Sequence, residues 1–296
     1  MRYLHVLASL IGIVIGGSLL GCAVAPSSAE TVRAEQVPGS ADSFGLILAA
    51  ADHEALYTLA GGLKPMSSGI WTGSFDVGSP DLKEMRSVRA ALEPLRNEIW
   101  YADVQVFDHV HDGERSMQAY VIHRAAFARV IDRFDAFWSR WGITPETHPP
   151  EVIAVVDRMP RADRWRGYGY LYGYPAGAVD FFVRAGLEAD DGREVGPGKD
   201  RRFVQIPTYA AETGRFTYAV PLDHTLTEED DALADKAGRV LRAYSARKAE
   251  MGSTARIIGE LRRLNRRFDS SVTRERRTGE LARVGMGDTD AVLDAR

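Results

Sequence analysis

The chain has 296 residues, a formal net charge of −4, 45% hydrophobic residues and 26% charged residues. This composition is typical of a folded globular protein and excludes a collagen-like or wholly disordered chain. The nearly balanced charge gives no general attraction to nucleic acid, and we expect no nucleic-acid partner.

The N-terminus is the most informative segment. Arg2 precedes an apolar stretch over residues 6–20, which has the length of a signal-peptide core and is short for a membrane span. Leu19, Leu20, Gly21 and Cys22 follow, and Cys22 is the only cysteine of the chain. These four residues resemble the lipobox of bacterial lipoproteins. An ordinary secretory signal or a short membrane anchor is the alternative.

The resemblance implies that residues 1–22 are a signal peptide and that a lipid such as palmitate on Cys22 anchors the chain to a membrane. The body would then lie outside the cytoplasm, in the cell envelope. If the source is a diderm bacterium, Ala23 after the cysteine implies the outer membrane. With no second cysteine, the body has no internal disulfide and no Cys-based zinc site.

The rest of the chain divides into three parts. Residues 23–42 are rich in Ala, Ser, Pro and Gly and predict a flexible tether. Residues 43–270 carry apolar periodicity and predict one domain. Residues 271–296 are charged and thinly apolar, and predict a poorly ordered tail.

The first elements of the domain are predicted to be a helix, a strand and a second helix. A helical apolar pattern begins at Ser43 and stops at Gly61 and Gly62. Residues 69–77 predict a strand, and residues 79–96 predict a helix with Pro80 near its first turn.

A β-hairpin follows over residues 100–121. Apolar and polar side chains alternate on both sides of Asp112-Gly113, a favoured two-residue turn. The turn predicts that Val104 lies opposite Val121 and that one face of the hairpin is apolar.

The remaining elements are mostly helical. Residues 124–141 and 151–159 predict helices, residues 203–209 and 216–220 a second hairpin, and Thr227 the start of a long helical region. This order predicts an α+β fold, with antiparallel hairpins packed against several helices.

The stretch RGYGYLYGYP, residues 166–175, has two readings. A strand would place four tyrosines on one face, as a platform for a ligand such as a sugar. A helix ending at Gly173 is favoured, because a glycine followed by an apolar residue and proline is typical of a helix C-terminus. The helix predicts that Tyr170 and Tyr174 lie away from the face of Tyr168 and Tyr172.

The candidates for a metal site are His109, His111 and Asp112, near the hairpin turn. Imidazole and carboxylate are zinc ligands, but a third protein ligand would have to come from elsewhere, because the alternation places His123 on the opposite face. We expect no metal and no cofactor.

The polar face of the hairpin mixes polar and aromatic groups, as recognition surfaces do. Together with the tyrosine stretch it is the candidate ligand-binding surface, made of Asp103, Gln105, Phe107, His109, Tyr120, Tyr168 and Tyr172. The alternative is that this face is a floor covered by a helix.

These observations predict a membrane-anchored lipoprotein with a binding or accessory role in the cell envelope, whose partner is an envelope protein or a small molecule. One alternative is an envelope-associated hydrolase that uses His109, Asp112 and Asp103, with or without a metal. Another is a structural subunit, which would expose a contiguous apolar patch.

Overall fold

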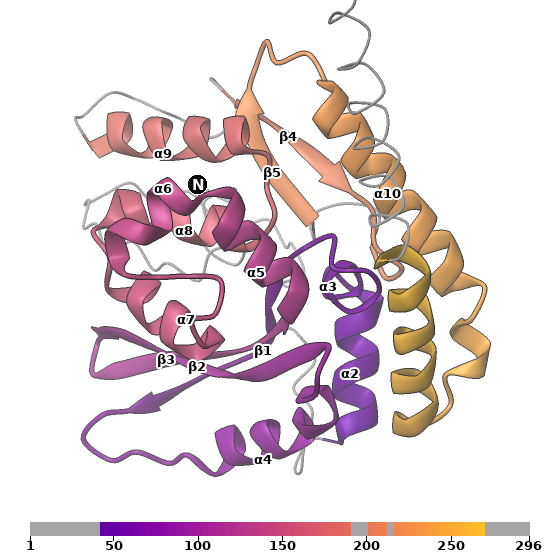
Figure 1. Ribbon diagram of the computed structural model, residues 1–296. Coiled ribbons are helices and arrows are strands. Elements are labelled where there is room, and N and C mark those ends of the chain that lie inside the picture. The colour runs from indigo at the N-terminus through magenta and orange to yellow at the C-terminus, as the bar shows by residue number, and fades with distance from the viewer. Residues whose placement is uncertain (1–41, 191–200, 212–215, 270–296) are drawn as a thin grey trace, which may run out of the picture.

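The computed structural model describes residues 42–190, 201–211 and 216–269. The predicted signal peptide with Cys22, the tail over 271–296 and all of the tether except Asp42 lie outside these residues. Asp42 caps the first helix, because its carboxylate accepts hydrogen bonds from the backbone N–H groups of Phe44 and Gly45. The described residues form helices and two small antiparallel sheets, which confirms the α+β prediction (Figure 1).

The larger sheet has the strand order β1-β3-β2, with bounds Met66–Asp76 for β1, Trp100–His111 for β2 and Glu114–His123 for β3. The predicted hairpin is β2-β3. Its turn residues Asp112 and Gly113 both have positive φ angles, 51° and 82°, as a type I′ turn requires.

The register of this hairpin departs from the prediction beyond the turn. His111 pairs with Glu114 and Val110 with Arg115, as expected, but an irregularity in β2 then shifts the pairing, and Val104 lies opposite Ala119. The predicted pair of Val104 with Val121 is therefore wrong. The shift from residue 121 to residue 119 is an even number of residues, so each side chain stays on its predicted face.

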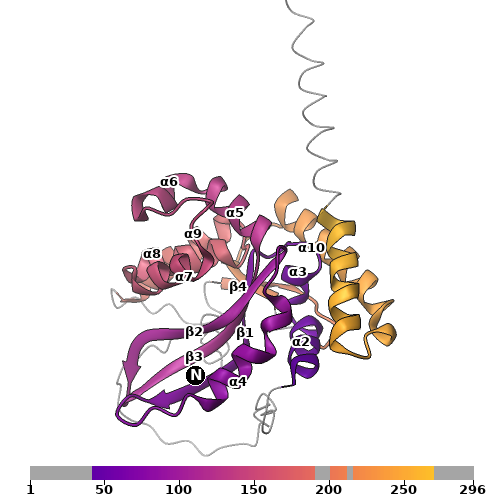
Figure 2. The same ribbon diagram turned by 60° about the horizontal axis from the view of Figure 1, so that its bottom comes forward.

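Each face of the sheet packs in its own hydrophobic core (Figures 1 and 2). The predicted apolar face, with Trp100, Val104 and Val121, packs with α2, α3 and α4, whose bounds are Ser43–Asp52, Leu56–Leu59 and Lys83–Ala91. The opposite face, with Tyr120 and Ile122, packs under a second helical layer. That layer consists of α5 (Arg124–Arg133), α6 (Asp135–Trp138), α7 (Pro149–Arg158), α8 (Arg161–Leu171) and α9 (Ala176–Asp190).

Three predicted helices are interrupted. The pattern after Ser43 forms α2 and α3 separately, and residues 124–141 form α5, α6 and a 3₁₀ turn, η2 (Ser139–Trp141). The second break is at Phe134, whose φ and ψ of −114° and 36° end α5 and whose ring stacks on Tyr170, with centroids 3.7 Å apart. Residues 79–96 likewise form α4 and η1 (Glu93–Leu95).

The second sheet pairs β4 (Arg201–Ile206) with β5 (Phe216–Pro221), and Figure 1 shows it between α9 and α10. Helix α10 (Glu228–Ser245) begins with a capping box, in which Thr227 and Asp230 bond reciprocally. A short turn, η3 (Lys248–Glu250), and a helix over residues 254–269 complete the described chain.

Candidate functional site

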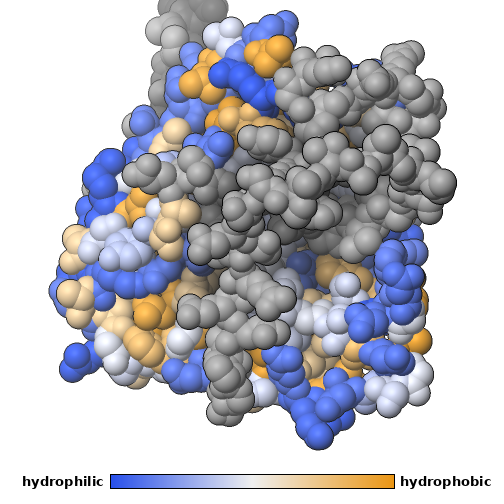
Figure 3. Space-filling view, turned by 180° about the vertical axis from the view of Figure 1, so that it is seen from behind, coloured by the Kyte–Doolittle hydropathy of each residue, from blue (hydrophilic) through white to orange (hydrophobic). Residues whose placement is uncertain are grey.

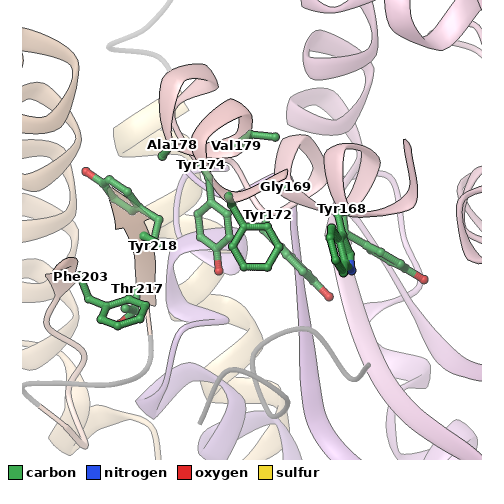
Figure 4. Close-up of a pocket in the computed structure, with 12 residues that line it drawn as sticks. Tyr168, Gly169, Tyr172, Tyr174, Ala178, Val179, Phe203, Thr217 and Tyr218 are labelled. Atoms are coloured by element: carbon green, nitrogen blue, oxygen red, sulfur yellow. The ribbon is translucent and has the colours of Figure 1, made fainter. Parts of the chain in front are cut away.

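A narrow pocket lies where the end of α8 and the start of α9 meet the second sheet (Figure 4). Its interior measures about 40 Å³, within about 540 Å³ of empty space that includes open solvent. Aromatic rings make most of its wall, with small residues between them. The lining residues are Trp165, Tyr168, Gly169, Tyr172, Tyr174, Ala178, Val179, Phe182, Phe203, Thr217, Tyr218 and Ala219.

The tyrosine stretch forms one wall of the pocket because it is helical. Residues 168 and 172 are one helical turn apart, and their rings stack with centroids 5.9 Å apart. Tyr170 points elsewhere, into the cluster of Phe134, Phe137 and Trp138. The prediction that Tyr170 leaves the face of Tyr168 and Tyr172 is confirmed.

The prediction for Tyr174 is wrong. Helix α8 ends in a Schellman motif, with Gly173 at φ 73°, the Gly173 N–H bonded to the Tyr170 carbonyl and the Tyr174 N–H bonded to the Gly169 carbonyl. This left-handed turn bends the chain back over the helix end. The Tyr174 ring therefore lies 5.9 Å from the Tyr172 ring and lines the same pocket.

The tyrosine hydroxyls are mostly engaged with partners outside the pocket. The Tyr168 hydroxyl accepts a hydrogen bond from Gln105 Nε2 at 2.7 Å, and the Tyr172 hydroxyl lies 2.7 Å from Ser68 Oγ. Burial raises the pKa values of both phenols above the usual value, so they stay protonated. The two residues thus contribute ring surface to the pocket more than hydrogen-bonding capacity.

Tyr218 is fixed by a buried carboxylate. Its hydroxyl donates to Asp230 Oδ1 at 2.5 Å, while His224 Nε2 lies 2.9 Å from Asp230 Oδ2, which also accepts from the Thr227 N–H and hydroxyl. Burial by itself raises the pKa of Asp230, but these hydrogen bonds outweigh it and lower the pKa to about 2. The helix cap of α10 therefore holds this side of the pocket wall.

Thr217 of the wall has a hydroxyl that is both buried and, among the described residues, unpaired. It is 7% exposed, and its Oγ1 is buried without a hydrogen-bond partner in the described structure. Thr217 and Ala219 are two residues apart on β5 and lie on one face of the second sheet. Phe203 of β4 lies on the same face, because it pairs with Ala219. The wall of the pocket thus contains a hydroxyl that is buried and without a hydrogen-bond partner in the described structure.

A buried lysine supports the same wall. Lys64 Nζ lies 2.8 Å from Glu54 Oε2, and its side chain is 1% exposed. The rings of Phe216, Tyr172 and Tyr174 surround the ammonium, with centroids 4.6, 5.4 and 5.8 Å away. Sequence reasoning did not single out Lys64. The sequence feature that could have marked Lys64 as buried is a single lysine flanked by glycine, leucine, proline and methionine.

The residues of the predicted ligand-binding surface do not lie together in the structure. Tyr168 and Tyr172 line the pocket, but Gln105 and Tyr120 are 6% and 2% exposed beneath the second helical layer. Asp103 is paired with Arg89 and Arg96, Phe107 is half-buried, and His109 is exposed near the turn. The polar face of the hairpin is therefore mostly covered by helices, as the alternative interpretation predicted. Thr217, Tyr218 and Phe203 were missed, because nothing local marks their approach to α8.

The candidates for metal or hydrolytic chemistry do not converge. At about 3.3 Å per residue, Asp103 and His111 lie roughly 25 Å apart along β2, and Asp103 is neutralised by two arginines. His111 Nδ1 lies 3.1 Å from Asp112 Oδ2 at the exposed turn. Among the described residues, no three His, Cys, Asp or Glu side chains come together to hold a metal ion.

Exposed large hydrophobic residues are scattered over several elements. They are Val77, Val110, Leu187, Tyr209, Leu222 and Leu226. Figure 3 shows the face opposite to that of Figure 1, where the coloured hydrophobic residues form small groups between hydrophilic ones. The coloured part of this face shows no contiguous apolar patch of the kind expected of a structural subunit.

Comparisons with protein-family models, with curated proteins and with solved structures each found no match. None of the helices in the described ranges combines the length and the apolar composition of a membrane span. The function is therefore inferred from the chain's own residues.

Proposed function

We propose that the protein is a lipoprotein of the cell envelope, anchored outside the cytoplasm through Cys22, whose domain binds a small apolar molecule in the tyrosine-lined pocket. The pocket is the observation that supports the binding role. It is concave and its lining is mainly apolar and aromatic, as the linings of small-molecule sites are.

The anchor and the pocket have complementary roles in this proposal. A lipid on Cys22 holds the chain at a membrane surface, and residues 23–42 give the domain reach away from it. The pocket then acts on molecules at or near that surface. The outer membrane is the expected location in a diderm bacterium, because Ala23 follows the cysteine.

The anchor is tested by labelling cells with radioactive palmitate. Wild-type protein is expected to take up label and to sediment with membranes, and Cys22→Ala to do neither. Ala25→Ser, a small change three residues away, is the matched control and should label like wild type. Equal labelling of Cys22→Ala would contradict the anchor.

The binding role is tested separately by methyl NMR of alanine and threonine in the full-length protein. The methyl groups of Ala178, Ala219 and Thr217 line the pocket and report on its occupancy. A bound apolar molecule should shift these signals saturably while leaving unchanged the methyl signal of Thr58, which is buried in α3 and is not among the lining residues. A library of small apolar compounds that shifts none of them would overturn the binding role.

A further inference from the structure

We propose that an open groove beside the helix over residues 254–269 binds a phosphate monoester. The groove lies between this helix and η3, and the helix occupies the edge of the molecule beside α2 and α10 (Figures 1 and 2). The groove shares no lining residue with the tyrosine-lined pocket. The inference therefore concerns a second site and goes beyond the proposed function.

One face of this helix is fixed in the core, which leaves another face for a ligand. Ile257, Leu261 and Leu264 are buried in the same hydrophobic core as α2. Arg256 and Arg263 are two helical turns apart on a different, exposed face. The core contacts thus fix the backbone positions of the two arginines while their side chains reach the groove.

The groove has room because residue 259 is a glycine. Gly259 lies one turn after Arg256 and one turn before Arg263 and lines the groove with them. An added Cβ there would have nothing within 4 Å, so packing does not require glycine, which costs stability inside a helix. The groove holds about 550 Å³, many times the roughly 30 Å³ that a water molecule takes up. A phosphate group and part of the molecule that carries it fit this space.

The charges of the groove match a dianion. Its lining residues and the neighbouring Arg247 include four arginines and two glutamates, which are Arg247, Arg256, Arg263, Arg266, Glu250 and Glu260. This set has a formal excess of two positive charges. A phosphate monoester carries about −1.5 to −2 charges at pH 7, whereas a carboxylate carries one. The monoester therefore balances the groove more closely than a carboxylate does.

The two glutamates do not close the groove to an anion, because arginines pair with both. Glu250 Oε2 lies 3.0 Å from Arg247 Nη1, and Glu260 Oε1 lies 3.0 Å from Arg263 Nη1. The guanidinium of Arg263 has five N–H donors, so it keeps donors for a phosphate oxygen. Arg256 is exposed, and none of the described carboxylates pairs with it.

The test follows the methyl NMR signal of Ala249, which lines the groove, in the full-length protein. Glycerol 1-phosphate should shift this signal saturably and leave the signal of Ala178, in the tyrosine-lined pocket, unchanged. At the same ionic strength, acetate should bind at least about tenfold more weakly, and sodium chloride should cause no shift. No shift with glycerol 1-phosphate, or equal affinity for acetate, would overturn the inference.

Two arginine variants on the same helix locate the ligand. Arg256→Gln removes a charge from the groove and should weaken binding of glycerol 1-phosphate about tenfold, as expected for one lost charge-assisted hydrogen bond. Arg267→Gln removes the same charge from an exposed residue outside the lining and should bind like wild type. Equal losses in the two variants would overturn the site, because they would show attraction by net charge alone.

Bilayers then decide whether the phosphate belongs to a lipid or to a soluble compound. The full-length protein is placed in phosphatidylcholine nanodiscs with and without phosphatidic acid, whose head group is a phosphate monoester. An Ala249 shift that needs phosphatidic acid assigns the site to a lipid head group, and a shift by glycerol 1-phosphate alone assigns it to a soluble compound. The apolar library tests the other pocket through Ala219, so either proposal can fail while the other stands.

Discussion

His123 Nε2 lies 2.8 Å from Asn265 Oδ1, and this contact ties the end of β3 to the helix over residues 254–269. The other ring nitrogen, Nδ1, accepts the Ala126 N–H at 3.1 Å and caps α5. An accepting Nδ1 carries no proton, so the ring is the neutral tautomer with its proton on Nε2. Both hydrogen bonds depend on that tautomer.

The protein should lose stability in weak acid because of His123. Burial lowers the pKa of His123 below the usual value of about 6.5, so the unfolded chain binds a proton at a higher pH than the folded chain does. The free energy of unfolding should therefore fall as the pH drops below about 6.5 towards the folded pKa, and His123 should contribute no slope at higher pH. Urea denaturation at pH 7.5 and pH 5.0 measures the difference.

His123→Asn keeps an oxygen to cap α5 but cannot titrate. We expect it to be less stable than wild type at pH 7.5, because Asn265 loses its partner, and to lose less stability between the two pH values. His111→Asn changes an exposed histidine at the hairpin turn and should keep the wild-type pH dependence. A wild-type slope in His123→Asn would show that other groups cause it.

Removing the carboxylate of Glu54 while Lys64 remains should cost more folding stability than removing the charge of Lys64. Glu54→Gln leaves a buried ammonium without its carboxylate and should lower the free energy of unfolding by about 3–5 kcal/mol. Lys64→Met replaces the chain by an apolar one among three rings, and the double variant Lys64→Met/Glu54→Gln should be more stable than Glu54→Gln alone. Chemical denaturation of all three gives the comparison, and equal losses in all three would contradict it.

Gly173 should tolerate no side chain. Its φ of 73° is left-handed, and an added Cβ would lie 2.9 Å from Pro65 Cδ, so Gly173→Ala should destabilise by at least about 1 kcal/mol. Gly177→Ala is the matched control, because Gly177 lies in the first turn of α9 with nothing within 4 Å of an added Cβ. That change should be neutral or stabilise by up to about 1 kcal/mol. Thermal unfolding distinguishes the two, and similar midpoints would argue against the Schellman turn.

Two buried threonines should respond to the same change with opposite signs. Thr217→Val removes an unpaired buried hydroxyl and should raise the free energy of unfolding by about 1 kcal/mol. Thr58→Val removes a hydroxyl that lies 2.8 Å from Ser67 Oγ and should lower it by about 1–2 kcal/mol. Urea denaturation without added ligand measures both, and a loss of stability in Thr217→Val would mean that its hydroxyl has a partner.

Local chemistry made the secondary structure largely predictable. The Asp112-Gly113 turn, the capping box at Thr227 and the helix end at Gly173 each depend on residues close in sequence, and all three are present. The faces of the β2-β3 hairpin were also predictable, since side chains alternate with period two even across the irregularity that changed the pairing. Tyr174 was misplaced because a left-handed turn breaks the helical period.

The sequence is sufficient to predict the α+β class, the faces of the β2-β3 hairpin, the capping box at Thr227 and the helix end at Gly173, and it supplies the prediction of a lipid anchor at Cys22. Tertiary structure alone decided that a second helical layer covers the polar face of the sheet, that Glu54 meets Lys64, and that β5 brings Thr217 to the tyrosines of α8. These contacts join segments whose own patterns do not specify their neighbours. Burial of apolar surface brings the layers together, and the close packing of side chains then fixes which groups meet.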